Sequence, residues 1–147
     1  MSMKQVISWL SVLLWMSLIY YLSHQPAAES TELSTGVMQV LIASFEAIFL
    51  FINLETEWFH FLIRKGAHFT AYFILGILLI NALRKSKAVD TSAMIALLLS
   101  VLYAISDEVH QLFIPGRSGE VRDVLIDSAG AAVGISLYYL LAKIKAK

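Results

Sequence analysis

Residues 91–113 read Thr91-Ser-Ala-Met-Ile-Ala-Leu-Leu-Leu-Ser-Val-Leu-Tyr-Ala-Ile-Ser-Asp-Glu-Val-His-Gln-Leu-Phe113, and this stretch decides the fold. A helix that crosses the roughly 30 Å hydrocarbon core of a membrane needs about 20 mainly apolar residues, and this stretch supplies them. It also carries Asp107, Glu108, His110 and Gln111 near its end. Each ionisable group in such a segment costs roughly 2.5–3.5 kcal/mol to insert. A chain that keeps them together is therefore expected to use them.

Three more apolar stretches approach the same length, at residues 5–22, 66–83 and 123–142. Together with residues 91–113 they predict an all-α integral membrane four-helix bundle, with the whole chain, 1–147, as one membrane domain. A fifth apolar stretch at about 37–54 is interrupted by Gln39, Glu46 and Asn53. A short span is one interpretation of it. We expect an amphipathic helix in a long outer loop over residues 23–65, either on the membrane surface or packed over the bundle. An even number of spans, four in all, supports this interpretation.

The composition agrees with a membrane protein and excludes several functions. Of the 147 residues, 59% are hydrophobic and 15% are charged, against about 25% charged residues in soluble domains. The formal net charge is zero, so no basic field indicates nucleic acid. Cysteine is absent, which excludes disulfides, thiolate metal sites and thiol nucleophiles.

The distribution of lysine and arginine predicts that both termini face the cytoplasm. With an inside N-terminus, seven basic residues lie on the inner side: Lys4, Arg84, Lys85, Lys87, Lys143, Lys145 and Lys147. Four lie on the outer side: Arg64, Lys65, Arg117 and Arg122. The excess follows the positive-inside rule. We expect the first stretch to stay as a helix, because Gln25-Pro-Ala-Ala-Glu29 offers no clean small-x-small cleavage site.

In this topology the outer ends of all four spans carry polar side chains at helical spacing, so their polar faces are predicted to meet in one pocket. Histidine beside a carboxylate suits general acid–base work. On this ground the candidate catalytic residues are His68, Asp107, Glu108, His110, Asp123 and Asp127. Residues that could hold a substrate, anions included, are His24, Arg64, Lys65, Tyr72, Gln111 and Arg117.

Several of these assignments leave an alternative open. Arg117 could bind an anion or form a salt bridge to Asp107, Glu108 or Asp123. A structural role for His24 is as reasonable as a site role. The spacing Gly130-x-x-x-Gly134 indicates close helix packing.

No metal is assigned to the site. Carboxylates at i and i+4 on one helix could hold magnesium or manganese if a phosphate completed the shell, but no HExxH or cysteine pattern is present. The sequence therefore leaves the cofactor undecided: a divalent cation fits the residues, and nothing requires one.

The motif residues also carry a family resemblance. They run Ser23-His24-Gln25-Pro26, then Arg64-Lys65-x-Ala67-His68-Phe69-x-x-Tyr72, then Ser106-Asp107-Glu108-x-His110-Gln111-x-Phe113-x-Pro115-Gly116-Arg117, then Asp123-x-x-x-Asp127-x-x-Gly130-x-x-x-Gly134. This succession closely resembles the VanZ-like family and covers almost the whole chain. The resemblance implies a small multi-pass protein of the bacterial cell membrane, in a family associated with low-level resistance to glycopeptide antibiotics, teicoplanin in particular.

Three functions are open on the sequence alone. The first is an enzyme, a hydrolase or transferase, acting on the headgroup of an outer-leaflet lipid such as a lipid-linked cell-wall precursor. The second is a binding module that sequesters, excludes or senses an amphiphile or a lipoglycopeptide. The third is a structural network of buried charges that fixes helix packing. The polar groups gather at one end of the spans rather than at the midplane, which speaks against transport. The sequence leaves the ligand, the reaction and the oligomeric state undetermined.

Overall fold

The computed structural model describes residues 2–44 and 56–145, and every regular element in these residues is an α-helix. The helices are α1 (Met3–Ser23), α2 (Ala27–Ser44), α4 (Thr56–Leu83), α5 (Val89–Gln111) and α6 (Val121–Lys145). Four of them contain segments long and apolar enough to cross a membrane: Met3–Ser23, Phe61–Leu83, Val89–Gln111 and Val121–Ile144. The predicted all-α four-helix membrane bundle is confirmed.

The bounds of all four spans differ by a few residues from the sequence-based expectation, and two of the differences lie at the polar residues. The second apolar span begins at Phe61 rather than at residue 66, so it includes Lys65, which is buried rather than left in an outer loop. The third helix ends at Gln111 rather than at residue 113. Pro115 explains this end, because a proline disfavours helical geometry in the residue before it. The chain instead turns, with the N–H groups of Phe113 and Ile114 donating to the carbonyls of His110 and Gln111.

The amphipathic helix expected at 37–54 is only partly within the described residues. Residues 37–44 form the second half of α2, which begins much earlier, at Ala27. Pro26 precedes it, and the carbonyl of Pro26 accepts from the N–H of Ser30. A proline fits there because the first N–H groups of a helix have no partner within the helix. Residues 45–54 of the prediction lie outside the described residues.

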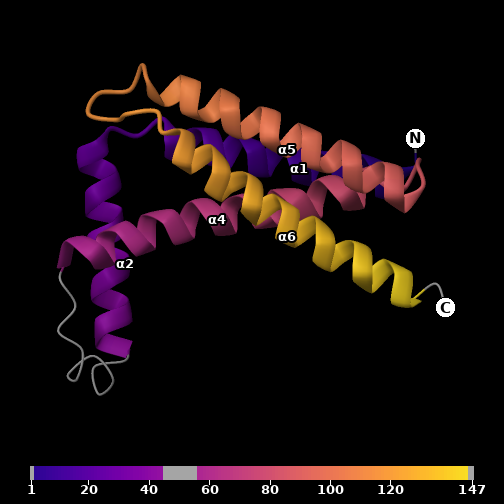
Figure 1. Cartoon of the computed structure of the whole chain (residues 1–147), viewed down its shortest axis with the longest axis horizontal. Helices are drawn as coiled ribbons and strands as arrows, with labels where there is room; N and C mark the ends of the chain where they lie inside the picture. Colours follow the sequence, from indigo (N-terminus) through magenta and orange to yellow (C-terminus); the bar gives the residue numbers. More distant parts are fainter. Residues whose placement is uncertain (1, 45–55, 146–147) are drawn as a thin grey trace.

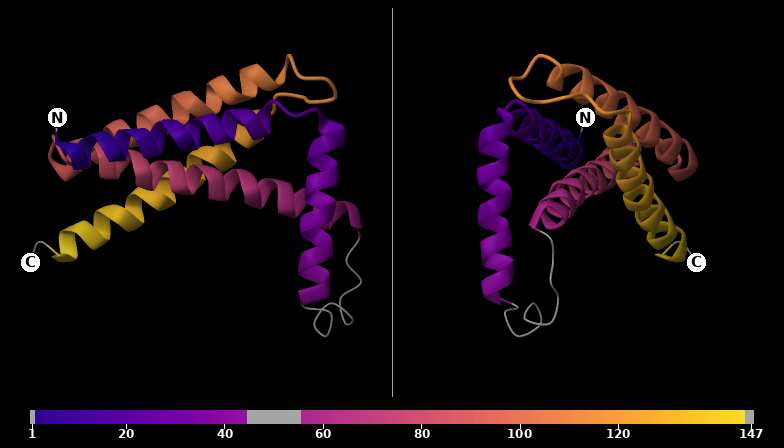
Figure 2. Two further views of the ribbon diagram at one scale, coloured as in Figure 1. Left: turned by 180° about the vertical axis from the view of Figure 1, so that it is seen from behind. Right: turned by 60° about the vertical axis from the view of Figure 1, so that its left-hand side comes forward.

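The four spanning helices run up and down, so that their polar ends come together. Figure 1 shows α1, α4 and α5 along the long axis, with α6 crossing α4 obliquely. The two views of Figure 2 agree that α2 lies across the bundle, at the end where residues 112–120 join α5 to α6. We call this end the polar end. It holds the C-terminal ends of α1 and α5, the N-terminal end of α6 and the N-terminal part of α4. Helices α4 and α6 therefore run in the same direction.

The closest packing in the bundle is between α4 and α6, and glycines permit it. A Cβ added to Gly130 would lie 2.3 Å from the carbonyl oxygen of Phe69, and one on Gly134 would lie 2.2 Å from that of Phe73. The opposite helix contributes Gly76, whose added Cβ would lie 2.6 Å from the carbonyl oxygen of Ala131. Small residues are what close backbone approach requires in lipid, where no hydrophobic force joins the helices.

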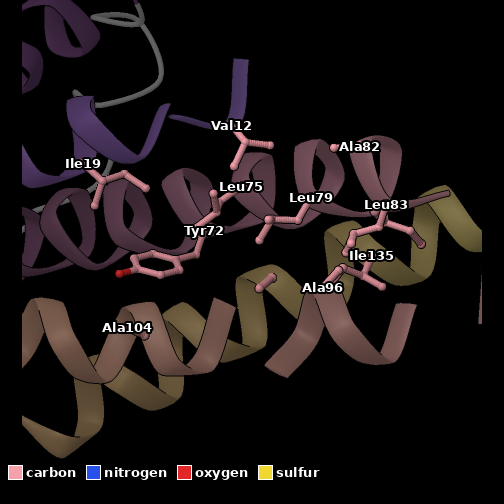
Figure 3. Close-up of a cluster of buried hydrophobic side chains, with 12 residues drawn as sticks. Val12, Ile19, Tyr72, Leu75, Leu79, Ala82, Leu83, Ala96, Ala104 and Ile135 are labelled. Carbon is pink, nitrogen blue, oxygen red and sulfur yellow. The ribbon is translucent and has the colours of Figure 1, made fainter. Parts of the chain in front are cut away.

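A compact apolar core continues from this contact, while the outward faces stay apolar for lipid. Figure 3 shows Leu75 and Leu79 of α4 among side chains from α1, α5 and α6. Two of the hydrogen bonds that hold α1 lie within the core: Trp15 Nε1 donates to the carbonyl of Ala71 at 2.8 Å, and the Tyr103 hydroxyl donates to the carbonyl of Met16 at 2.7 Å. The core thus fixes the four helices that carry the polar end.

Candidate functional site

The polar end buries a group of charged and polar side chains that lie on facing helices. Those less than a tenth exposed are Ser23, Lys65, Asp107, Glu108, Gln111, Asp123 and Asp127. They come from α1, α4, α5 and α6, so each spanning helix contributes side chains to the polar end. Buried charges of this kind are stable only when they are paired or hydrogen-bonded, so their partners define the site.

Between the parallel helices α4 and α6, two basic side chains of α4 each contact a carboxylate of α6. Lys65 Nζ contacts Asp123 Oδ1 and lies 3.4 Å from Glu120 Oε2. One turn further along both helices, His68 Nδ1 lies 3.2 Å from Asp127 Oδ1. The i to i+3 step on α4 and the i to i+4 step on α6 keep both pairs in register, because these spacings stay on one helix face. The close contact at Gly130 thus holds His68 against a carboxylate that is fully buried.

Between α5 and α1, an amide links a carboxylate to a hydroxyl. Gln111 Nε2 donates to Ser23 Oγ at 2.8 Å and to Asp107 Oδ2 at 3.4 Å. Asp107 and Gln111 are four residues apart on α5, so they share a face of the helix. The pattern orients Asp107, which is 4% exposed, toward the other helices.

Within residues 2–44 and 56–145, His110 has no hydrogen bond or ion pair to a carboxylate, although Asp107 and Glu108 are its neighbours in sequence. Its Nε2 lies 3.0 Å from Nδ1 of His24, and the two rings stack with centroids 5.2 Å apart. The ring of Tyr20 adds a third aromatic surface, with its centroid 4.7 Å from that of His110. His24 and His110 therefore form a separate pair at the edge of the polar end.

The loop between α5 and α6 packs onto the end of α5. Glu108 Oε2 accepts the backbone N–H of Glu120 at 2.7 Å, and a Cβ on Gly119 would lie 2.8 Å from the carbonyl oxygen of Glu108. Gly116 adopts a φ of +74°, a conformation that favours glycine. This fold of the loop carries Arg117 back over the end of α1.

Arg117 bonds to backbone carbonyls rather than to a carboxylate. Its Nε donates to the carbonyl of Gln25 at 3.0 Å, and its Nη2 donates to that of Leu22 at 3.3 Å. A cation at the C-terminal end of α1 is favoured by the unpaired carbonyls there. The pKa of Arg117 is lowered from its ordinary value, first because burial disfavours the charged form and second because the charge of Arg64 lies nearby. Two guanidiniums that repel each other are a favourable setting for an anion.

A cavity of about 310 Å³ opens beside these groups. Its walls come mainly from α1, α2 and α4, with Asp107 from α5 and Gln25 and Arg117 from loops, and they are largely apolar. The lining is Ile19, Leu22, Ser23, Gln25, Ser30, Leu33, Val37, Ile63, Arg64, Ala67, His68, Ala71, Tyr72, Asp107 and Arg117. The side chains that carry charge or can carry it are Arg64, His68, Asp107 and Arg117. An apolar pocket with a few convergent polar groups is the usual form of a small-molecule site.

The predicted site residues thus fall into three groups. Five line the cavity: Arg64, His68, Tyr72, Asp107 and Arg117. Five more form the buried network beside it: Lys65, Glu108, Gln111, Asp123 and Asp127. His24 and His110 form the outlying pair. The sequence-based interpretation missed the contribution of α2, whose Leu33 and Val37 complete the cavity wall. Their i, i+4 apolar spacing was the available signal.

Three side chains, one from the cavity lining and two from the buried network, have the composition of a metal site. His68, Glu108 and Asp127 each offer a ligand atom, and these three atoms lie within 4.8 Å of one another. Glu108 Oε1 and the Tyr72 hydroxyl are the buried side-chain polar atoms, among those of the described residues, that have no hydrogen-bond partner.

The family model VanZ/LLP1 matches residues 8–142, which include all the motif positions at the polar end. The chain belongs to the VanZ/LLP1 family. Among curated proteins and among solved structures, none matches the chain. With four helices suited to spanning a bilayer, this VanZ/LLP1 protein is a multi-pass membrane protein.

Proposed function

We propose that this VanZ/LLP1 protein takes the headgroup of an amphiphilic membrane lipid into the cavity at the polar end, which we call the headgroup cavity from here on, and acts on the headgroup chemically. The observation that carries the proposal is the lining of that cavity, where apolar walls lead to Arg64, Arg117, His68 and Asp107. Such a lining suits a molecule with an apolar chain and a negatively charged head. A phosphate-bearing lipid, such as a lipid-linked cell-wall precursor, has this form.

The two arginines supply the recognition. Arg64 is exposed and has no hydrogen-bond or ion-pair partner among the described residues, so its guanidinium is available to an incoming anion. Arg117 is half-buried and anchored to the end of α1, so its position is already set before a ligand arrives. A guanidinium binds phosphate through two parallel N–H groups, and a fixed one loses less entropy in doing so.

His68 and Asp107 supply the chemistry in this proposal. Both line the cavity, and the His68 ring is held by Asp127, as a catalytic imidazole is usually held by a carboxylate. The reaction is then a hydrolysis or transfer at the headgroup, with His68 moving the proton. Exclusion of water by the apolar walls strengthens the electrostatic interactions of these groups.

We further propose that the cavity serves the outer leaflet of the bacterial cell membrane, with both termini in the cytoplasm. The excess of basic residues at the opposite end supports this orientation. A change in a cell-wall precursor at this leaflet, or capture of the acyl tail of a lipoglycopeptide, would contribute to glycopeptide resistance such as that to teicoplanin.

The second candidate is a binding module that holds the same amphiphile without changing it. The specific observation in its favour is the predominance of apolar side chains in the cavity lining, which suits an acyl or prenyl chain. The two candidates share the recognition step and differ only in whether a product forms.

The test uses the full chain in vesicles of phosphatidylglycerol with added polyprenyl phosphate, with bound lipid and product followed by mass spectrometry. Arg64→Gln and Arg117→Gln are expected to weaken lipid binding about tenfold or more, since a hydrogen bond to a charged group contributes about 1.5–3 kcal/mol. Arg122→Gln is the matched control, because Arg122 is exposed at the same end and lies outside the cavity lining.

Two further variants separate chemistry from binding. His68→Gln and Asp107→Asn are expected to retain bound lipid and to form no product. If the wild-type protein holds the lipid and releases it unchanged, the binding module replaces the enzyme. If Arg64→Gln and Arg117→Gln bind lipid as the wild type does, both forms of the proposal are wrong.

A further inference from the structure

The charges buried at the polar end do not balance. Four carboxylates are less than a tenth exposed, those of Asp107, Glu108, Asp123 and Asp127. One lysine in the described part of the chain, Lys65, is buried to the same degree, and it pairs with Asp123. Three buried carboxylates are left without a buried lysine or arginine, and His68 is the nearest group that could carry charge. A buried charge costs several kcal/mol unless it is paired or bound to a metal.

Two of the remaining three carboxylates converge with His68 on one point. The ligand atoms of His68, Glu108 and Asp127 lie within 4.8 Å of one another. Metal bonds to carboxylate oxygen and imidazole nitrogen are about 2.0–2.2 Å long, so a shared ion brings its ligand atoms to about 3–4.5 Å apart. The three side chains therefore need only small rotations to share an ion. They come from α4, α5 and α6, and the glycine contact between α4 and α6 holds two of those helices together.

A second observation indicates a ligand here: two buried side-chain oxygens have no hydrogen-bond partner. Glu108 is 5% exposed, and while its Oε2 accepts the N–H of Glu120, its Oε1 has no partner. The hydroxyl of Tyr72 is likewise unpartnered, in a side chain that is 1% exposed. Figure 3 shows this hydroxyl pointing along the bundle toward the end where Ile19 and Ala104 lie, which is the polar end. A buried polar atom without a partner costs about 1–3 kcal/mol, and an ion would remove that cost at Glu108.

We propose that His68, Glu108 and Asp127 bind a divalent cation. The donor set is two carboxylates and one imidazole, which suits manganese or zinc better than calcium or magnesium, whose shells are made of oxygen alone. Its two positive charges offset the two carboxylates that hold it. The free positions of the shell would face the headgroup cavity, because His68 belongs to the cavity lining.

This inference does not rest on the proposed function, since the cation needs no lipid in order to bind. The two proposals overlap at His68: where it is a ligand, it sets the position of the cation next to the headgroup, and the proton transfer then falls to Asp107, which also lines the cavity. A phosphate in the headgroup cavity would then complete the coordination shell. Failure of either proposal leaves the other standing.

The experiment is a titration of the full, untagged chain in detergent with Mn²⁺ after treatment with a chelator. Electron paramagnetic resonance measures free Mn²⁺, and Zn²⁺ is then added to displace the bound ion. One saturable equivalent is expected. Pulsed measurements should detect coupling of the bound Mn²⁺ to a single imidazole nitrogen. Glu108→Gln and Asp127→Asn are expected to weaken binding at least tenfold, and Glu108→Gln keeps a carbonyl oxygen for the N–H of Glu120.

Two control variants test whether side chains outside the proposed site bind the ion. Asp90→Asn removes an exposed carboxylate from the opposite end of α5, and His110→Gln breaks the pair of histidines that could bind a metal by themselves. Both should bind Mn²⁺ as the wild type does. The proposal is overturned if the wild-type chain binds neither Mn²⁺ nor Zn²⁺ saturably or if the bound Mn²⁺ shows no nitrogen coupling. Loss of binding in His110→Gln, or its retention in Asp127→Asn, also overturns it.

Discussion

The contact between α4 and α6 yields the sharpest prediction, because a single methyl group tests it. In Gly130→Ala the new Cβ would lie 2.3 Å from the carbonyl oxygen of Phe69, and in Gly134→Ala it would lie 2.2 Å from that of Phe73. Ordinary contact begins near 3.4 Å, so the two helices must separate by about 1 Å. The obstacle is backbone on a packed helix and cannot rotate away.

The expected cost follows from that displacement. Overpacking of a filled core costs about 1–3 kcal/mol, and we expect each variant to lose about 3 kcal/mol because no side chain can absorb the clash. The matched control is Gly66→Ala, on α4, where an added Cβ meets nothing within 4 Å. Alanine is favoured over glycine inside a helix by about 1 kcal/mol, so this control should be unchanged or slightly more stable.

Equilibrium unfolding in mixed micelles of increasing dodecyl sulfate content measures these differences, with the fluorescence of the three tryptophans as the signal. The same separation should weaken the contacts of Lys65 with Asp123 and of His68 with Asp127, so Mn²⁺ binding should fall in step with stability. If Gly130→Ala and Gly134→Ala unfold within about 0.5 kcal/mol of Gly66→Ala, the close approach of α4 and α6 is refuted.

Two other predictions concern topology and buried charge. Because the chain has no cysteine, S118C and S86C can each be labelled alone, and a membrane-impermeant maleimide should modify S118C but not S86C in intact cells; the reverse result would invert the proposed orientation. Lys65→Met should destabilise the protein by about 3 kcal/mol, since it leaves the carboxylate of Asp123 buried without a partner, and adding Asp123→Leu should restore much of that loss. The exposed pair made by Arg122 should contribute less than 1 kcal/mol by the same unfolding assay, and equal effects of Lys65→Met and Arg122→Gln would contradict the burial argument.

The sequence by itself determined the spanning helices and the end of the bundle at which polar groups gather. Both are local properties: the length of an apolar stretch sets a span, and a spacing of three or four residues sets which side chains share a helix face. The stripe of Lys65, His68 and Tyr72 and the stripe of Asp123 and Asp127 could therefore be recognised in advance.

Only the tertiary structure decided which polar helix faces contact each other. His68 pairs with Asp127 rather than with the carboxylates of α5, because Gly130 and Gly134 bring α6 closest to α4. His110 turns instead to His24, at the edge of the polar end. Helix α2 completes the headgroup cavity with apolar side chains that carry no motif. Spacing along one helix specifies a face, whereas the partner of that face depends on how closely the backbones can approach, and that is settled only when the helices pack.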